Sequence, residues 1–135
     1  MPDEAARKAL VLEYCRRMNA GDLDGTLALF APDARFEDPV GAPPMIGTGA
    51  IRAHLGQAVE SQVREYPVDP MAAMDDEHVV IPVGVTLKLP RLPTGKRARI
   101  NLVSVIRIGT DDLIHDVRVY WGESDMAIVD VDSDL

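Results

Sequence analysis

The sequence contains a single cysteine, few positive charges and no long hydrophobic run. Cys15 cannot form a disulfide within the chain, so the cysteine content gives no support for secretion into an oxidising compartment. The 14 Lys and Arg residues against 22 Asp and Glu leave a formal net charge of −8, which disfavours nucleic acids and anionic membrane surfaces as partners. No apolar run is long enough to span a bilayer.

The chain also lacks the marks of export and of disorder. Met1 to Glu4 do not carry the basic and apolar regions of a signal peptide, so we expect a cytoplasmic protein. There is no repeat, linker or low-complexity run, and 47% of the residues are hydrophobic, which is typical of a folded chain. A length of 135 residues predicts one domain, 1–135, in which we expect the acidic stretch 125–135 to fray.

Three helices are expected in the first half of the chain. Residues 3–19 have an acidic start, Gly21 beyond their end, and an apolar stripe at helical spacing. Asp22 is a candidate N-cap for a second helix that reaches about Ala31, and a third helix is expected over about 47–59. The stripe of the first helix comprises Leu10, Val11, Tyr14, Cys15 and Met18, and the second helix is expected to bury Leu23, Leu27 and Phe30.

The second half of the chain alternates with period two, as β-strands do. Residues 79–89 and 98–108 flank a turn at 93–96, and 117–121 follow a turn at 109–112. Pro82 and Gly84 indicate an edge or a bulge in the first of these strands. Helices followed by antiparallel strands predict an α+β domain with the helices on one face of a curved sheet.

Asp38 lies at the end of a short apolar strand. Ala34, Phe36 and Asp38 share one face of it, and the Pro- and Gly-rich residues 39–44 stop the strand and stiffen the loop beyond. A carboxylate at the rim of an apolar interior becomes more basic, because desolvation disfavours its charged form. Asp38 is therefore a candidate general base, and the alternative is an Asp that caps a turn.

Three further polar side chains point toward the predicted interior. Ser104 is polar on an otherwise aliphatic strand face, Tyr14 lies on the stripe of the first helix, and Trp121 offers an indole N–H. Hydroxyl donors opposite a carboxylate suit proton abstraction beside a carbonyl, since the donors stabilise the enolate oxygen. Taken one at a time, these residues more often pack in a core or bond to nearby backbone.

At these residues the chain resembles the bacterial Δ5-3-ketosteroid isomerases, within the wider superfamily of nuclear-transport-factor-2-like (SnoaL-like) cone folds. The resemblance extends over nearly the whole chain. The Glu-Asp-Pro-hydrophobic-Gly run followed by Pro-Pro is its narrowest signal. The matching residues are Tyr14, seven residues before Gly21-Asp22, then Phe36-Glu37-Asp38-Pro39-Val40-Gly41 with Pro43-Pro44 and Gly47, and finally Val119-Tyr120-Trp121.

The resemblance implies a cone-shaped fold, with three N-terminal helices packed on a curved, mainly antiparallel sheet, and a homodimeric isomerase that uses no cofactor and no metal. It implies that Asp38 carries a proton from steroid C4 to C6 through a dienolate, with Tyr14 as the principal oxyanion donor. Ser104 stands where the best-known members carry a protonated Asp, and we expect it to be the second donor. We expect the apolar steroid substrate to contact Phe36, Leu102, Val119 and Trp121.

The sequence departs from the isomerase pattern in its supporting residues as well. Phe30 and Leu55 stand where some members have tyrosines that hydrogen-bond the oxyanion Tyr, so Tyr14 has less support. Serine differs from the usual Asp because its hydroxyl stays neutral over the working pH range, whereas a buried Asp donates only while protonated.

Other functions stay open. A polyketide cyclase of the same fold could use the same Asp as a base. An epoxide hydrolase of this fold needs groups that position water and protonate the epoxide, commonly an Asp-Arg-Asp arrangement, and three arginines of this chain are predicted to face outward, which argues against it. A non-catalytic, dimeric small-molecule-binding module would need Asp38 only as a turn residue. The outward arginines are Arg35, Arg99 and Arg118.

The remaining charged and titratable groups are predicted to be structural. His54, His78 and His115 lie on different elements without metal-ligand spacing, which indicates structural or exposed roles rather than a zinc site. The basic cluster around the 88–99 hairpin predicts a solvated face, and it comprises Lys88, Arg91, Lys96, Arg97 and Arg99.

Overall fold

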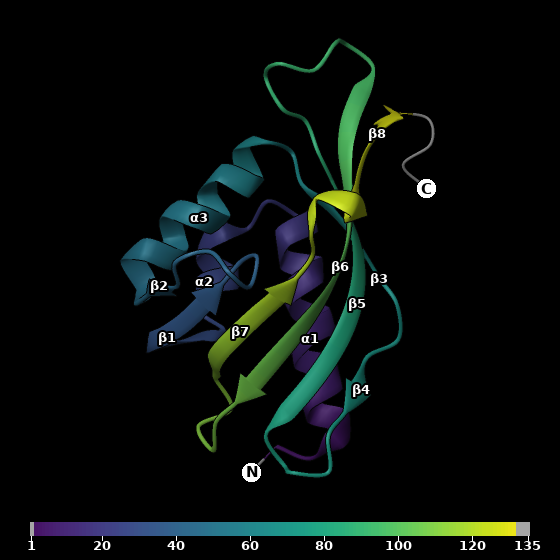
Figure 1. The fold of residues 1–135 in the computed structure, drawn as a ribbon. Helices are drawn as coiled ribbons and strands as arrows, with labels where there is room; N and C mark the ends of the chain where they lie inside the picture. Colours follow the sequence, from purple (N-terminus) through teal and green to yellow (C-terminus); the bar gives the residue numbers. More distant parts are fainter. Residues whose placement is uncertain (1, 132–135) are drawn as a thin grey trace.

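Three helices pack on a bent, eight-stranded sheet in the computed structural model, which describes residues 2–131 (Figure 1). This arrangement confirms the predicted α+β, cone-like fold. In chain order the elements are α1 (Glu4–Asn19), α2 (Leu23–Leu27), β1 (Phe30–Glu37), β2 (Met45–Ile46), α3 (Thr48–Glu60), β3 (Arg64–Pro67), β4 (Met71–Ala72), β5 (His78–Leu87), β6 (Lys96–Ile108), β7 (Ile114–Tyr120), the 3-10 turn η1 (Glu123–Asp125) and β8 (Met126–Asp130).

The sheet is mixed but mostly antiparallel. Its strand order is β2-β1-β7-β6-β5-β3, with β4 added to β5 and β8 added to β6. The β1–β7 pair is parallel, and the other pairs are antiparallel. The long β5–β6 hairpin forms the spine of the sheet in Figure 1. No helix within residues 2–131 is long and apolar enough to cross a membrane.

Capping side chains set the ends of α1 and α2. The Asp3 carboxylate accepts a hydrogen bond from the Ala6 N–H at 2.8 Å, and the Asp22 carboxylate accepts one from the Gly25 N–H at 2.9 Å. Gly21 adopts a φ of 69° between the two helices, a conformation that residues with a Cβ rarely adopt. The local sequence therefore starts both helices as predicted.

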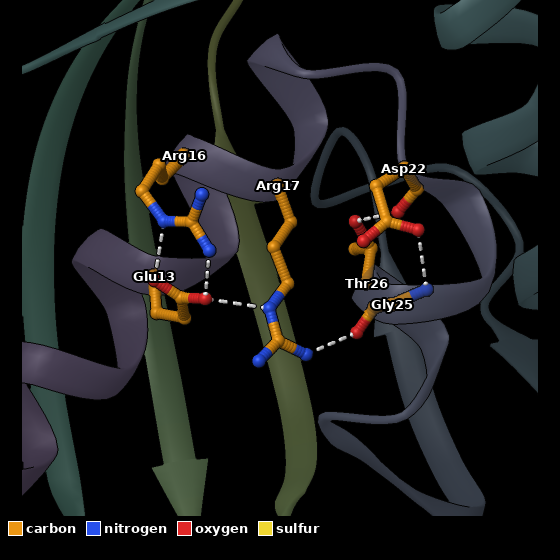
Figure 2. A network of polar contacts seen from close by, with 6 residues as sticks. All are labelled: Glu13, Arg16, Arg17, Asp22, Gly25 and Thr26. Atoms are coloured by element: carbon orange, nitrogen blue, oxygen red, sulfur yellow. Dashed lines mark hydrogen bonds and ion pairs between the residues drawn. The ribbon is translucent and has the colours of Figure 1, made fainter.

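Charged side chains tie α1 to α2 on the surface (Figure 2). The Glu13 carboxylate accepts hydrogen bonds from Arg16 at 2.7 and 2.5 Å and from Arg17 at 2.6 Å. Arg17 also donates to the carbonyl of Gly25 at 2.6 Å, which links the two helices directly.

The second helix is shorter than predicted, because α2 ends at Leu27 rather than near Ala31. Phe30 begins β1 instead, where it pairs with Ile114, and the Leu29 carbonyl accepts from the Ile114 N–H at 2.8 Å. Pro32 disfavours helical backbone at the residue before it. Pairing with a strand more than eighty residues away is invisible in the local apolar pattern.

The predicted edge or bulge at Pro82 and Gly84 is absent on the β6 side of β5, but on the other side the ladder is interrupted at Pro82, between β3 and β4. The β5–β6 register continues unbroken through both residues, and β5 is an interior strand. Pro82 is tolerated because its carbonyl accepts from Val68 on the side of β3 and β4, where neither strand pairs with it. The missing N–H therefore faces the gap between two short partner strands.

The C-terminal stretch is more ordered than predicted. Residues 126–130 form β8 on β6, alongside Lys96 to Ile100, beyond the part of β6 that pairs with β7. β8 thereby pairs with a part of β6 whose backbone groups would otherwise have no partner strand on that side. The remaining part of the predicted frayed tail, residues 132–135, lies outside the described residues.

Arg97 is buried rather than part of a solvated face. Its side chain donates to the Thr86 hydroxyl at 3.0 Å, to the Thr86 carbonyl at 3.1 Å and to the Gln62 carbonyl. These acceptors offset the desolvation of the guanidinium. Three of the other basic residues are exposed to solvent as predicted, namely Lys88, Arg91 and Lys96. Arg99 is half-buried.

Candidate active site

The helices and the sheet line a partly open cavity of about 290 Å³. Its wall is mostly aliphatic, and it receives side chains from both long helices and from the inner face of the sheet. The inward face of β5 is buried as predicted, with Val79, Ile81, Val83 and Val85 in the core. The polar residues in this apolar wall are Tyr14, Asp38, His54, Gln57, Ser61, Glu65, Ser104 and Trp121.

All seven of the predicted site residues line this cavity. Tyr14, Asp38 and Ser104 come from α1, the end of β1 and the middle of β6. The predicted substrate contacts Phe36, Leu102, Val119 and Trp121 lie on the same wall. Residues distant in sequence therefore meet at one site, and their chemical roles stay predictions.

Asp38 follows the last residue of β1, so its side chain reaches the cavity beside the buried Phe36. The Trp121 Nε1–H donates to Asp38 Oδ1 at 2.9 Å. His54 Nε2 lies 3.0 Å from Asp38 Oδ2. Each carboxylate oxygen thus has one protein partner and keeps a lone pair for a substrate proton.

His54 is a site residue that the sequence interpretation assigned to a structural role. It lies on α3 in the same stripe as Ile51, Leu55 and Ala58, and its ring packs 5.3 Å from the ring of Phe36. The spacing 51, 54, 55 and 58 is the helical i, i+3, i+4, i+7 pattern. That pattern was the available signal that His54 faces inward.

Glu65 was missed altogether. It lies on β3 and lines the cavity with Val63, two residues earlier and on the same face of the chain. Burial raises the pKa of the Glu65 carboxyl to about 7, with a smaller opposing effect from a hydrogen bond with the Cys15 thiol, and the charge of Asp38 raises it further. A glutamic acid that keeps its proton near neutral pH is a candidate general acid.

Asn19 fixes the backbone that carries Glu65. Its side-chain amide donates to the Glu65 carbonyl at 2.8 Å, and its side-chain oxygen accepts from the Glu65 N–H at 2.6 Å. This paired contact joins the end of α1 to β3, across 46 residues of sequence.

Tyr14 is held as a neutral hydroxyl. Burial raises its pKa well above the ordinary value, and the charges of Glu65 and Asp38 act in the same direction. Its ring makes an edge-to-face contact with Phe30, at 6.1 Å between ring centroids. Ser104 is 9% exposed and pairs with Ile81 on one side and Val119 on the other, so its hydroxyl is part of the cavity wall.

No arginine of residues 2–131 lines the cavity, as the sequence predicts. Arg35 forms ion pairs with Glu37 and Asp116, and Arg118 pairs with Asp116. Among the histidines, His78 bonds Asp75 and His115 bonds Asp111, both at the surface. Among residues 2–131 the candidate site therefore offers two carboxyl groups, an imidazole, an amide, hydroxyls and an indole, and no Lys or Arg side chain.

Residues 11–117 match the family described as the SnoaL-like domain. The chain belongs to the SnoaL-like domain family. It is 47% identical over 125 residues to the epoxide hydrolase LasB of Streptomyces lasalocidi, covering 93% of this chain and 44% of LasB. This SnoaL-like chain thus spans less than half the length of LasB.

Two solved structures share the fold. The epoxide hydrolase/cyclase-like enzyme SalBIII, described in pyran ring formation in the polyether salinomycin, is 32% identical with a TM-score of 0.91, covering 96% of this chain and 100% of SalBIII. A computationally designed 17-OHP binder is 18% identical with a TM-score of 0.80, covering 92% of this chain and 96% of the binder, and shows the fold alone.

A steroid Δ-isomerase of Nocardioides simplex is 27% identical over 121 residues, covering 90% of this chain and 94% of the isomerase. The chain is therefore a cone-fold member of a superfamily that includes epoxide hydrolases and isomerases. The comparisons favour the epoxide-opening alternative over steroid isomerisation, which stays an unconfirmed prediction.

Proposed function

We propose that this protein opens an epoxide in an apolar substrate by general acid–base catalysis, with Asp38 as the base and Glu65 as the acid. The observation that carries the proposal is a single aliphatic cavity that holds a hydrogen-bonded carboxylate and a buried carboxyl group whose pKa is raised to about 7. Two carboxyl groups in different environments are suited to opposite proton transfers.

The reaction needs one proton taken and one given. Asp38 removes the proton of the attacking hydroxyl, the oxygen of that hydroxyl bonds to an epoxide carbon, and the carbon–oxygen bond of the ring breaks. Glu65 donates its proton to the departing oxygen, so an alkoxide never accumulates. Protonation matters here because an alkoxide is a poor leaving group, even with ring strain to help it.

The neighbouring groups support these two roles. Hydrogen bonds from His54 and Trp121 orient the Asp38 carboxylate. Tyr14 stays neutral and offers a second donor to the epoxide oxygen from the same cavity. Without an arginine in the cavity wall, protonation of the epoxide falls to Glu65 and Tyr14.

The attacking hydroxyl is proposed to belong to the substrate, so that the product is a cyclic ether. The cavity wall is mostly aliphatic, which favours an apolar chain over a retained water molecule. The similarity to LasB, named as an epoxide hydrolase, and to SalBIII, described in pyran ring formation, supports both ring opening and ring formation.

An apolar epoxide with a hydroxyl four or five carbons away tests this function in ¹⁸O-labelled water. We expect a cyclic ether without the label. A labelled diol would show hydrolysis instead, and no turnover of any such epoxide would refute the proposal. Asp38→Asn is expected to abolish turnover, whereas Asp33→Asn, on the exposed part of the same strand, should leave it unchanged.

Steroid isomerisation is the second candidate, favoured by the meeting of Asp38, Tyr14 and Ser104 in one cavity. An ultraviolet assay with 5-androstene-3,17-dione detects the conjugated enone product. That reaction needs Asp38 and the two hydroxyl donors but no acid at Glu65. Glu65→Gln should therefore spare isomerisation and stop epoxide opening, which separates the two functions with one variant.

A further inference from the structure

We propose that His54 carries the proton of Asp38 out of the cavity, so that its imidazole restores the base after each turnover. The inference rests on the proposed epoxide opening. It concerns the step after the chemistry, which the acid and the base alone do not explain.

The two hydrogen-bond partners of Asp38 differ in what they can do with a proton. Trp121 donates its indole N–H to Oδ1 and has no lone pair with which to accept. His54 Nε2, at 3.0 Å from Oδ2, can either donate or accept, depending on the tautomer. Of these two partners, His54 is the one that can take up the proton of Asp38.

The position of His54 provides a path outward. Its side chain is 30% exposed and that of Asp38 is 22% exposed, so the imidazole lies at least as close to solvent as the carboxylate. The contact with Phe36, at 5.3 Å and 55° between the rings, holds the imidazole with Nε2 toward Asp38. No hydrogen bond joins Nδ1 to another of the described residues, which leaves Nδ1 for water.

Each turnover changes the protonation state of both carboxyl groups. Asp38 ends with the proton of the attacking hydroxyl, and Glu65 ends without its own. While Asp38 is ionised, His54 donates to it from Nε2–H, so the reset begins with a change of tautomer, in which water takes the Nε2 proton and supplies one at Nδ1. The Asp38 O–H bond then breaks as a bond forms between that proton and Nε2, and the Nδ1 proton of the resulting imidazolium passes to a water molecule. Glu65 takes a proton from water once the product has left. One proton leaves and one enters, and the imidazole ends in the tautomer in which it began.

His54→Gln tests the relay, because a glutamine amide can keep the hydrogen bond to Oδ2 but cannot carry a proton. In rapid-quench experiments with the epoxide substrate, we expect the first turnover to stay within about twofold of the wild-type rate. Later turnovers should slow by about 100-fold, the lower end of what a positioned proton-transfer group contributes. The progress curve should therefore show a burst of about one product per site.

His54→Ala with added imidazole provides the rescue arm. Free imidazole should restore the later turnovers in proportion to its neutral form. Trp121→Phe is the matched control, because it removes the other hydrogen bond to Asp38 without removing a group that exchanges protons. It should slow the first and the later turnovers alike and should not respond to imidazole.

Other results would overturn the relay. Equal steady-state rates for His54→Gln and wild type would show that the reset needs no imidazole. A first turnover slowed as much as the later ones would assign His54 to orientation of Asp38 only. If the wild-type protein turns over the epoxide in either case, the proposed function stands while the relay fails. A wild-type protein that leaves every epoxide unchanged overturns both.

Discussion

Two glutamates, one on α1 and one packed near it, have carboxyl pKa values that are shifted in opposite directions. Glu13 lies on the surface of α1 between Arg16 and Arg17 (Figure 2), and hydrogen bonds from these two arginines lower its pKa to about 2. Glu65 faces the cavity from β3, and burial raises its pKa to about 7. The chemistry of the two groups is identical, so the difference lies entirely in their surroundings.

The comparison teaches where acid catalysis can reside. Glu13 is ionised at any physiological pH, and it accepts a hydrogen bond from Arg17, which in turn donates to the Gly25 carbonyl of α2. Glu65 can keep its proton near neutral pH because its carboxyl lies among apolar walls with a thiol and a carboxylate as neighbours. A raised pKa in a cavity marks a functional candidate, whereas a lowered pKa in an arginine cluster marks a structural one.

The largest expected effect is on activity. Glu65→Gln keeps the shape of the side chain and removes the proton donor, so we expect the rate of epoxide opening to fall by about 10²- to 10⁴-fold. Glu13→Gln should leave the rate within about twofold of wild type, since Glu13 lies outside the cavity. Steady-state rates of the two variants measure this contrast, and equal losses would show that Glu65 has no special role.

The next effect is on stability, with a definite sign. Between pH 4.5 and about 7 the native protein keeps a proton on Glu65 that the unfolded chain has released. Stability therefore falls as pH rises through this window, by up to about 3 kcal/mol from this residue. Glu65→Gln should remove that loss and be more stable than wild type at pH 8. Urea unfolding of both proteins at pH 5 and pH 8 checks this prediction. If Glu65→Gln lowers the free energy of unfolding by the same amount at both pH values, the prediction is contradicted.

A smaller effect is the pH dependence of the wild-type rate. Since Glu65 acts as an acid, the rate should decline above about pH 7, by about tenfold per pH unit, as the carboxyl ionises. A pH–rate profile of kcat measures this limb. A rate that stays flat to pH 9 would rule out Glu65 as the required acid.

The smallest effect concerns the positioning of Glu65. Asn19→Ala removes the paired hydrogen bonds to the Glu65 backbone, and we expect a stability loss of about 1–2 kcal/mol with a several-fold lower kcat. The matched control is Asn101→Ala on β6, whose side chain accepts one long hydrogen bond of 3.4 Å from Arg99. Equal effects of the two substitutions on kcat would argue against a positioning role for Asn19.

Much of the fold could be predicted because its signals are local. Asp3 and Asp22 cap helices at their own positions, and the alternation of Val79 to Val85 places one strand face inside. The predicted element boundaries are wrong where pairing with a strand far away in sequence determines the local structure. Phe30 joins Ile114 and ends α2 early, and residues 126–130 find an open edge of β6.

The site residues also fall into those that local sequence reveals and those that depend on distant contacts. Asp38 could be found because its strand, its proline and its loop lie within a few residues of it. Glu65 has no such surroundings in the sequence, and for His54 the helical spacing indicates only that it faces inward. Their chemistry depends on groups that reach them across the cavity, namely Asp38, Cys15 and the apolar wall.

The sequence by itself determined where helices begin, which strand faces are apolar and that a carboxylate lies at the rim of the interior, because propensity, periodicity and turn chemistry act over a few residues. The tertiary structure alone decided which groups surround that carboxylate and which glutamate keeps its proton. Desolvation and hydrogen bonding depend on distance in space, and the chain folds Glu65, His54 and Trp121 to the same cavity as Asp38 from four separate segments.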